Sequence, residues 1–299
     1  MFVTFLVRAL FITIVTIAII APFTFLVPKP ALSGKVLPPV DASIEPVLAE
    51  SEPITPKEII KKDSEPALHN IKIPDFAGIN DIPTKKRTFF AYLLPAINAE
   101  NNKLLVKRQQ LTLWHQQMTL GAGISQEHDS LLKQWAKDYR VTNNDSTLHT
   151  LEALLLRVDI IPSELVLVQA ANESAWGTSR FARQGLNFFG IWCYKKGCGM
   201  VPKSRNLGAN HEVAAFKSVE ASVAGYFNNI NKHNAYQLLR KLRAELRAKD
   251  QPLDAQVLAS GLLHYSERGS EYVLDITDMI RQNQAYFVNV SANKVAQNN

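Results

Sequence analysis

One acidic residue of this sequence, Glu173, lies where a negative charge is costly. It stands near the end of the largely apolar run VDIIPSELVLVQAANES, and a Trp-Gly pair follows at 176–177. Apolar surroundings disfavour the charged form of a carboxyl group and raise its pKa, and a carboxyl group that stays protonated near neutral pH can donate a proton in catalysis. A partly exposed helix end, at which Glu173 points into water, would also account for this pattern. The run therefore offers a candidate general acid that the rest of the sequence has to support.

Two cysteines, Cys193 and Cys198, are separated by four residues in CYKKGC. In an exported chain such a pair forms a disulfide more often than it stays reduced, and a turn at Gly197 lets the short loop close. Two free thiols would be the expectation in the cytosol. No metal and no cofactor are expected, because no second CxxC or paired-His pattern is present and Ala215 stands where a zinc helix starting at His211 needs its second histidine.

The sequence from residue 86 onward is predicted to be mostly helical. Apolar residues in 86–118 have helical spacing in two pieces, which are interrupted near Pro95 because proline lacks a backbone donor. Pro162 and Ser163 open the helix that carries Glu173, a first-turn position that proline tolerates. Helices are expected at 127–139, 147–156, 163–174, 218–231 and 234–249.

The stretch 185–218 has a different character. It contains five of the thirteen glycines, the cysteine loop and the short β-prone pieces FFGIW and EVAAF. We therefore expect a small β-hairpin inserted among the helices.

Basic residues are concentrated in the folded part. Residues 86–299 contain 25 Lys and Arg against 18 Asp and Glu, a net charge of +7. This charge favours an acidic or polyanionic neighbour, although solubility alone would also explain it. Nucleic acid is not an expected partner, because the basic residues lack interleaved stacking aromatics. One side of the predicted helix at 234–249 is basic and is expected to be solvated; it comprises Arg240, Lys241, Arg243, Arg247 and Lys249.

The N-terminal part divides into two segments. Residues 9–27 contain no charged residue and follow Arg8, so residues 1–33 are predicted to be a signal peptide or a membrane anchor. The small residues Ala31 and Ser33 offer a cleavage site, whereas the length of the apolar run favours an uncleaved anchor. Residues 28–85 hold ten of the fifteen prolines, so 34–85 are predicted to be a disordered tether before a domain at 86–299.

The central stretch VQAANESAWGTSRFARQGLNFFGIW resembles the core of bacterial β-N-acetylglucosaminidases of glycoside hydrolase family 73, in which a helix ends in a catalytic Glu before Ser-x-Trp-Gly. The block NFFGI is similar to that family's Asn-Leu-Phe-Gly-Ile. YSERGSEYVLDITDMI resembles its tyrosine segment, with one residue inserted between Tyr265 and Tyr272. The resemblance covers about residues 150–284, and the order of anchor, tether and domain is similar to the Bax-type subgroup.

The resemblance implies a mainly α (α+β), lysozyme-like domain with a small β-hairpin and a sugar-binding cleft. It implies that Glu173 is catalytic and that the protein lies on the periplasmic side of the bacterial inner membrane, anchored or secreted. Asn187 would donate to an N-acetyl group or cap the local turn. Two or three of the aromatic residues are expected to contact sugar rings, from a set of Trp176, Phe188, Phe189, Trp192, Tyr265 and Tyr272.

A second catalytic acid is not evident. In the family it sits on the hairpin, but the corresponding stretch MVPKSRNLGAN contains no Asp or Glu. Glu212, on the returning strand, is the nearest candidate and could equally be a plain strand residue, whereas Glu220 opens the next helix as a dipole-complementing residue. If neither acts, the 2-acetamido group of the substrate could serve as nucleophile, so the sequence leaves this group open.

The resemblance implies a peptidoglycan hydrolase that cuts the β-1,4 bond after N-acetylglucosamine, with glycan strands as substrate. The expected state is a monomer held at the inner membrane by its N-terminal helix. A lytic transglycosylase of the same fold needs one Glu and is favoured by the missing hairpin acid, whereas the NFFG block and the tyrosine segment favour the hydrolase. A non-catalytic, membrane-tethered wall-binding protein is a third reading, but such a module has no need of Glu173 in an apolar run.

Overall fold

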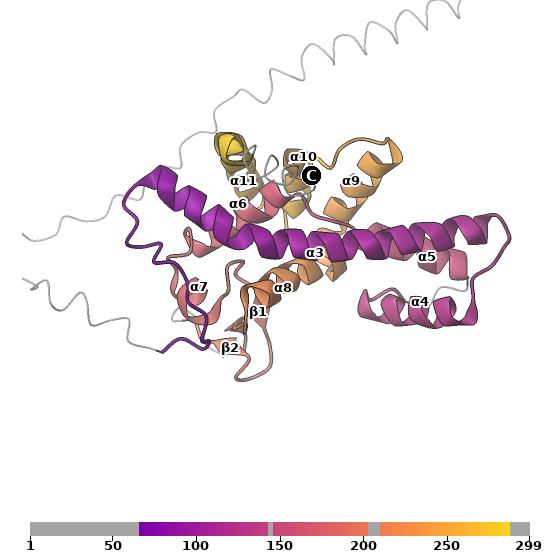
Figure 1. Ribbon diagram of the computed structural model, residues 1–299, viewed down its shortest axis with the longest axis horizontal. Helices are drawn as coiled ribbons and strands as arrows, with labels where there is room; N and C mark the ends of the chain where they lie inside the picture. The colour runs from indigo at the N-terminus through magenta and orange to yellow at the C-terminus, as the bar shows by residue number, and fades with distance from the viewer. Residues whose placement is uncertain (1–65, 143–145, 203–209, 288–299) are drawn as a thin grey trace, which may run out of the picture. The chain divides into compact units, whose positions relative to one another are not determined.

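The computed structural model describes residues 66–142, 146–202 and 210–287, and these residues are mainly helical, as predicted (Figure 1). The predicted signal or anchor segment and residues 34–65 of the predicted tether lie outside the described residues. Within the described part of the chain, no helix combines the length and the apolar character needed to cross a membrane. The helices are α3 (Ile82–Thr119), α4 (Gln126–Asp138), α5 (Thr147–Arg157), α6 (Ser163–Ser174), α7 (Arg180–Gly185), α8 (Val219–Lys232), α9 (Gln237–Ala248), α10 (Ala255–Ala259) and α11 (Ser270–Gln282), with 3-10 turns η2 (Asn234–Tyr236) and η3 (Ser260–Leu262).

Helix α3 is continuous, which corrects the prediction of two helical pieces. Asp81 caps it by accepting a hydrogen bond from the Thr84 N–H, and Pro95 lies inside it. The ribbon of α3 changes direction in its N-terminal part (Figure 1), as expected where proline removes one hydrogen bond. The helix continues through this bend because apolar residues on both sides of it, such as Leu93 and Ile97, are fully buried.

Residues that precede position 86 also pack against the helices. The Phe76 side chain is 2% exposed and makes edge-to-face contacts with Phe89 and Tyr92, with ring centroids 5.4 and 5.8 Å apart. The Leu68 N–H donates to the Gln184 carbonyl at 2.8 Å. Residues 66–85, which the sequence assigns to the tether, therefore contribute to the packing of the folded part.

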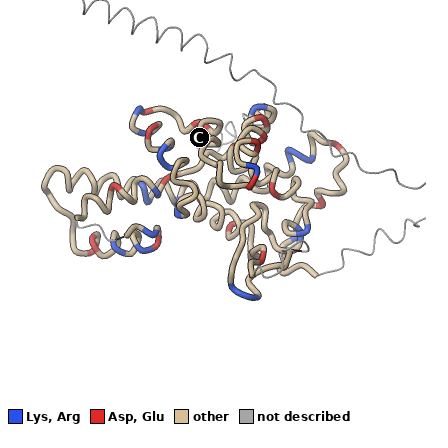
Figure 2. The backbone as a smooth tube through the Cα atoms, turned by 180° about the vertical axis from the view of Figure 1, so that it is seen from behind, with Lys and Arg blue, Asp and Glu red and all other residues tan. Residues whose placement is uncertain are grey.

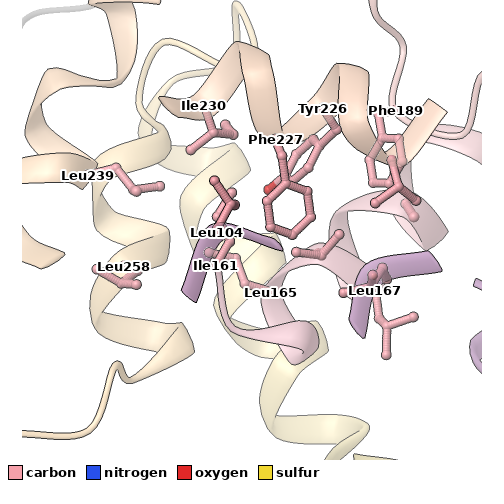
Figure 3. Packing of buried hydrophobic residues seen from close by; sticks show 14 of the residues in the cluster. Leu104, Ile161, Leu165, Leu167, Phe189, Tyr226, Phe227, Ile230, Leu239 and Leu258 are labelled. Carbon is pink, nitrogen blue, oxygen red and sulfur yellow. The ribbon is translucent and has the colours of Figure 1, made fainter. Parts of the chain in front are cut away.

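Helix α6 runs through the centre of the core. Its residues 165–171 are buried, because the segment is apolar nearly all round and is packed against α3, α10 and α11. Figure 3 shows Leu165 of this segment near Leu104 of α3 and the ring of Phe227 from α8, with Leu167 on another side of the helix. The helix that carries Glu173 is thus held on several sides.

Helices α4, α5, α6, α8 and α9 agree with the predicted positions, whereas α7, α10 and α11 were not predicted. The prediction of a solvated basic side on α9 is wrong for two residues: Arg240 and Arg243 are 2% and 1% exposed. Figure 2 shows that Lys and Arg are interspersed with Asp and Glu over the described residues.

The β structure is a three-stranded antiparallel sheet made of β1 (Trp192–Cys193), β2 (Gly199–Met200) and β3 (Glu212–Ala214), in the order β1-β3-β2. The pairing of β1 with β3 joins the two pieces expected to form the hairpin, and β2 adds a strand on the other side of β3. Gly199 permits this pairing because a Cβ there would lie 2.0 Å from the Val213 carbonyl oxygen.

Candidate active site

Glu173 is held in the last turn of α6, just before a tight reversal of the chain. Ala175, Trp176 and Gly177 have φ angles of 49°, 58° and 79°, so three successive left-handed residues end the helix. The Ser174 hydroxyl fixes this turn by donating to the Ala170 carbonyl at 2.6 Å and accepting from the Gly177 N–H at 2.9 Å. A Cβ on Gly177 would lie 2.4 Å from the Phe76 ring, so the turn also requires glycine for packing.

A chain of buried hydrogen bonds leads to the Glu173 carboxyl group. The Tyr226 hydroxyl donates to Gln169 Oε1, and Gln169 Nε2 donates to the Tyr272 hydroxyl at 2.9 Å. The Tyr272 hydroxyl is in turn hydrogen-bonded to Glu173. Gln169 precedes Glu173 by four residues on α6, so both side chains lie on one face of the helix. This chain of donors fixes the orientation of the carboxyl group.

Burial raises the pKa of Glu173 above its ordinary value. The hydrogen bonds from Tyr272 and Asn172 and the positive charge of Arg268 act in the opposite direction and lower the pKa, but burial is the largest cause. Asn172 Nδ2 donates to Glu173 Oε1 at 3.2 Å. A carboxyl group with a raised pKa keeps its proton at a higher pH, as a general acid requires.

Replacing Tyr272 by Phe is expected to raise the pKa of Glu173 further. The hydroxyl hydrogen bond stabilises the carboxylate, so its loss favours the protonated form. NMR titration of the Glu173 carboxyl carbon measures this shift directly. Tyr236→Phe is the matched control, because Tyr236 lies in the same cavity and its hydroxyl accepts from Asn229. An unchanged or lower pKa in Tyr272→Phe would show that this hydroxyl does not donate to Glu173.

Glu173 lines a cavity of about 1450 Å³. Gly190 lies directly beside the carboxyl group, since a Cβ on it would be 3.5 Å from Glu173 Oε2. The absence of a side chain at Gly190 leaves one side of the carboxyl group open to a ligand. The rest of the wall comes from the end of α4, with Asp138 and Arg140, and from parts of three further segments: 189–194 at β1, 225–236 in α8 and η2, and 263–269 before α11.

Asn187 is a turn residue in this structure. Its side chain donates to the carbonyls of Ile191 and Ala214, both at 2.8 Å, and accepts from the N–H groups of Phe189 and Ile191. It is 2% exposed and is not part of the cavity wall. These contacts place the loop that carries Gly190 and tie it to the sheet.

The candidate aromatic residues are divided between the cavity and the core. Tyr265 and Phe189 line the cavity, and the Tyr265 hydroxyl donates to the Phe189 carbonyl at 2.8 Å. Tyr272 stacks on Tyr265 with centroids 5.5 Å apart and lies behind it, 1% exposed. Trp176 lies outside the cavity wall and packs against Phe89 and Phe90 of α3. Phe188 also lies outside the wall and packs against Phe89.

Glu212 is tied to the cysteine loop and is not part of the cavity wall. Its two carboxylate oxygens accept from the N–H groups of Gly197 and Gly199 at 2.9 and 2.8 Å. Cys193 and Cys198 are joined at disulfide distance, with Cα atoms 6.3 Å apart, as predicted. The Glu212 carboxylate and both sulfur atoms lie within 4.8 Å of one another, but disulfide sulfurs offer no thiolate to a metal.

The structure adds polar residues to the cavity that sequence reasoning did not single out. Asn228 and Lys232 lie four residues apart on α8, and Asn229 lies beside them in sequence. The sequence pattern that could have identified them is this group of polar residues near the end of a largely apolar helix. Arg268, in the tyrosine segment, also lines the cavity, and its charge acts on Glu173.

Comparisons with known proteins agree with this site. A family model described as mannosyl-glycoprotein endo-β-N-acetylglucosaminidase (Glucosaminidase) matches residues 149–285, which contain the whole cavity wall except Asp138 and Arg140. The chain is similar to Protein bax of Escherichia coli (strain K12), with 34% identity over 213 residues, or 71% of this chain and 74% of the relative. No solved structure matches the chain significantly.

Proposed function

Because the chain belongs to the Bax-type family of proteins with a glucosaminidase domain, we propose that it is a peptidoglycan hydrolase that cleaves the β-1,4 bond after N-acetylglucosamine. The observation that carries the proposal is Glu173, a carboxyl group with a raised pKa on the wall of a large cavity. The exposed aromatic side chains of Trp192 and Tyr194 on the same wall offer flat apolar faces to sugar rings.

In this proposal the domain has a lysozyme-like arrangement and works in the periplasm, where glycan strands are reached from an N-terminal anchor. The disulfide between Cys193 and Cys198 supports an oxidising compartment. The disulfide also closes the loop 193–198, which contains the cavity residue Tyr194 and directly follows the cavity residue Trp192.

Glu173 is the general acid of the proposed reaction. Its proton goes to the glycosidic oxygen while the bond from that oxygen to C1 of N-acetylglucosamine breaks. The Tyr272 hydroxyl then stabilises the carboxylate that is left. In the second step the carboxylate takes a proton from the water that attacks C1, and the acid is regenerated.

The nucleophile is proposed to be the 2-acetamido oxygen of the substrate. Glu212, the candidate from sequence, has both carboxylate oxygens engaged with backbone N–H groups of the cysteine loop, and it does not line the cavity. Attack by the acetamido oxygen forms an oxazolinium ring, and water opens it with overall retention of the β anomer.

A lytic transglycosylase is the second candidate, favoured by the same placement of Glu212. That reaction also needs one acid, and the 6-hydroxyl group of the muramic acid displaces the leaving group intramolecularly. The product has a 1,6-anhydro end, and the reaction consumes no water.

Product analysis of digested peptidoglycan tests the proposal. After borohydride reduction, hydrolysis at N-acetylglucosamine leaves N-acetylglucosaminitol at the new ends, and an early proton-NMR spectrum should show the β anomer first. Anhydro-muramic ends would establish the transglycosylase, and an α anomer first would require a positioned base such as Glu212. Binding to peptidoglycan without any new ends would identify a wall-binding protein and refute the proposed activity.

A further inference from the structure

Besides Arg268, the basic residues Arg140 and Lys232 line the same cavity as Glu173. Arg140 follows α4 and is exposed, whereas Lys232 is the last residue of α8 and is half-buried. The Lys232 ammonium lies 4.9 Å from the centroid of the Tyr139 ring, and Lys107 lies over the same ring at 5.2 Å. Segments on two sides of the cavity thus bring positive charge to one part of its wall.

The positive charge at this place exceeds the negative charge. Burial lowers the pKa of Lys232, and the neighbouring cations Lys107 and Arg140 lower it as well, whereas Asp138 and Glu100 raise it. Arg157 adds a further cation, because its guanidinium donates to the Lys232 carbonyl at 2.8 Å and lies close enough to Arg140 for its pKa to be lowered. Four cations therefore face two carboxylates: Lys107, Arg140, Arg157 and Lys232 against Glu100 and Asp138.

In the described residues, neither Arg140 nor Lys232 is in a direct ion pair, unlike Arg268, which pairs with Asp275. Within residues 66–142, 146–202 and 210–287, no carboxylate oxygen lies within 4.0 Å of the side-chain nitrogens of Arg140 or Lys232. Asp138 also lines the cavity and offsets part of the charge from a greater distance. Glu100 is engaged with Lys103 at 3.2 Å. Both signs of charge along α4 are visible in Figure 2. A half-buried ammonium among like charges is stabilised by an anion that enters the cavity.

Because Glu173 shares this cavity, the anion is expected to be part of the molecule on which Glu173 acts. In peptidoglycan the sugar that alternates with N-acetylglucosamine carries a lactyl group. Its carboxylate is either free or extended by a stem peptide with carboxylates of its own. We propose that Arg140 and Lys232 bind a carboxylate carried by this substituent, so that the protein prefers muramic-acid-containing strands to neutral N-acetylglucosamine oligomers. This inference rests on the proposed function for the identity of the ligand.

Binding measurements in a Glu173→Gln background test the inference without turnover. Isothermal titration compares a peptide-bearing tetrasaccharide of peptidoglycan, the same glycan after enzymatic removal of its peptides, and chitotetraose, which is neutral. Arg140→Gln with Lys232→Gln is expected to weaken binding of a carboxylated ligand at least about 10-fold and binding of chitotetraose less than about 2-fold. Loss confined to the peptide-bearing ligand identifies the stem peptide as the source, and loss on the denuded glycan identifies the lactyl carboxylate.

Lys137→Gln is the matched control, since Lys137 is exposed on α4 three residues before Arg140 and does not line the cavity. If the double variant misfolds, Arg140→Gln alone still tests the inference, because Arg140 is exposed and its substitution should leave the packing intact. Added salt should reduce the preference for charged ligands and leave chitotetraose binding unchanged. An equal loss on all three ligands, or no loss on either carboxylated ligand, would overturn the inference. Failure of the unmutated protein to cut any glycan would refute the proposed function separately, because selective binding is measured without cleavage.

Discussion

Glu173→Gln should lower the rate of glycan cleavage about 1000-fold or more. Gln keeps the shape of the side chain and cannot donate the proton, and removal of a general acid typically costs about two to four orders of magnitude. The measurement is release of reducing ends from peptidoglycan, with zymography as a second readout. Glu164→Gln is the matched control, because Glu164 is in the first turn of the same helix and lies outside the cavity wall. If Glu173→Gln retained a tenth of the activity, Glu173 would not be the acid.

The same substitution should leave the protein equally stable or more stable at pH 7. The folded pKa of Glu173 lies above the ordinary 4.5, so between these two values the folded state binds more protons than the unfolded state. Stability contributed by this residue is therefore present below pH 4.5 and lost as the pH rises through the folded pKa. Gln does not titrate, so the difference in Tm between Glu173→Gln and the unmutated protein should grow from about pH 4 to pH 7. A Tm that fell on substitution at pH 7 would contradict this account of burial.

Local sequence determined the position of Glu173. The apolar run 165–171, opened by Pro162 and closed by Trp176 and Gly177, is long enough for a buried helix and has clear ends. The short sheet was also partly predictable, because FFGIW and EVAAF are β-prone and the structure pairs them. These features depend on neighbours in the sequence, which can be recognised without the fold.

The contacts of the candidate site residues depend on residues far along the chain. Asn187 bonds to Ala214, and Trp176 packs on Phe90, so neither contact can be recognised from the residue type alone. Glu212 was placed on the returning strand by its sequence, but its hydrogen bonds to Gly197 and Gly199 arise only when the cysteine loop folds back over β3. The helix or strand on which a residue lies was therefore easier to predict than the contacts that its side chain makes.

The buried arginines of α9 are the clearest case of such dependence. A helix with leucines on one side and basic residues on the other is usually solvated on its basic side. Here the guanidinium of Arg243 is placed under the end of α5, where the last carbonyl groups of the helix have no partners within it. Arg243 donates, at 2.8 to 3.3 Å, to the backbone carbonyls of Leu156, Arg157, Asp159 and Ile160 and to Asn231 Oδ1.

The loop that Arg243 holds leads directly into α6. Asp159 completes the arrangement by accepting two hydrogen bonds from Arg247, at 2.9 and 3.1 Å, and by pairing with Arg108 at 3.4 Å. Burial lowers the pKa of Arg243 to about 10, so the side chain stays charged at neutral pH. Its charge is balanced by carbonyl dipoles and by the Asp159 carboxylate.

Arg243→Met should lower the free energy of unfolding by about 3–5 kcal/mol. Met fills much of the same volume but removes the donor to the carbonyl groups of Leu156, Arg157 and Ile160 and to the Asn231 amide oxygen, and it removes one of the cations around Asp159. Chemical denaturation at pH 7 measures the loss. Lys241→Met is the matched control, because Lys241 is an exposed basic residue of the same helix and its substitution should change stability by no more than about 0.5 kcal/mol. Equal small effects of the two substitutions would mean that the α5–α6 loop, and with it the placement of Glu173, does not depend on Arg243.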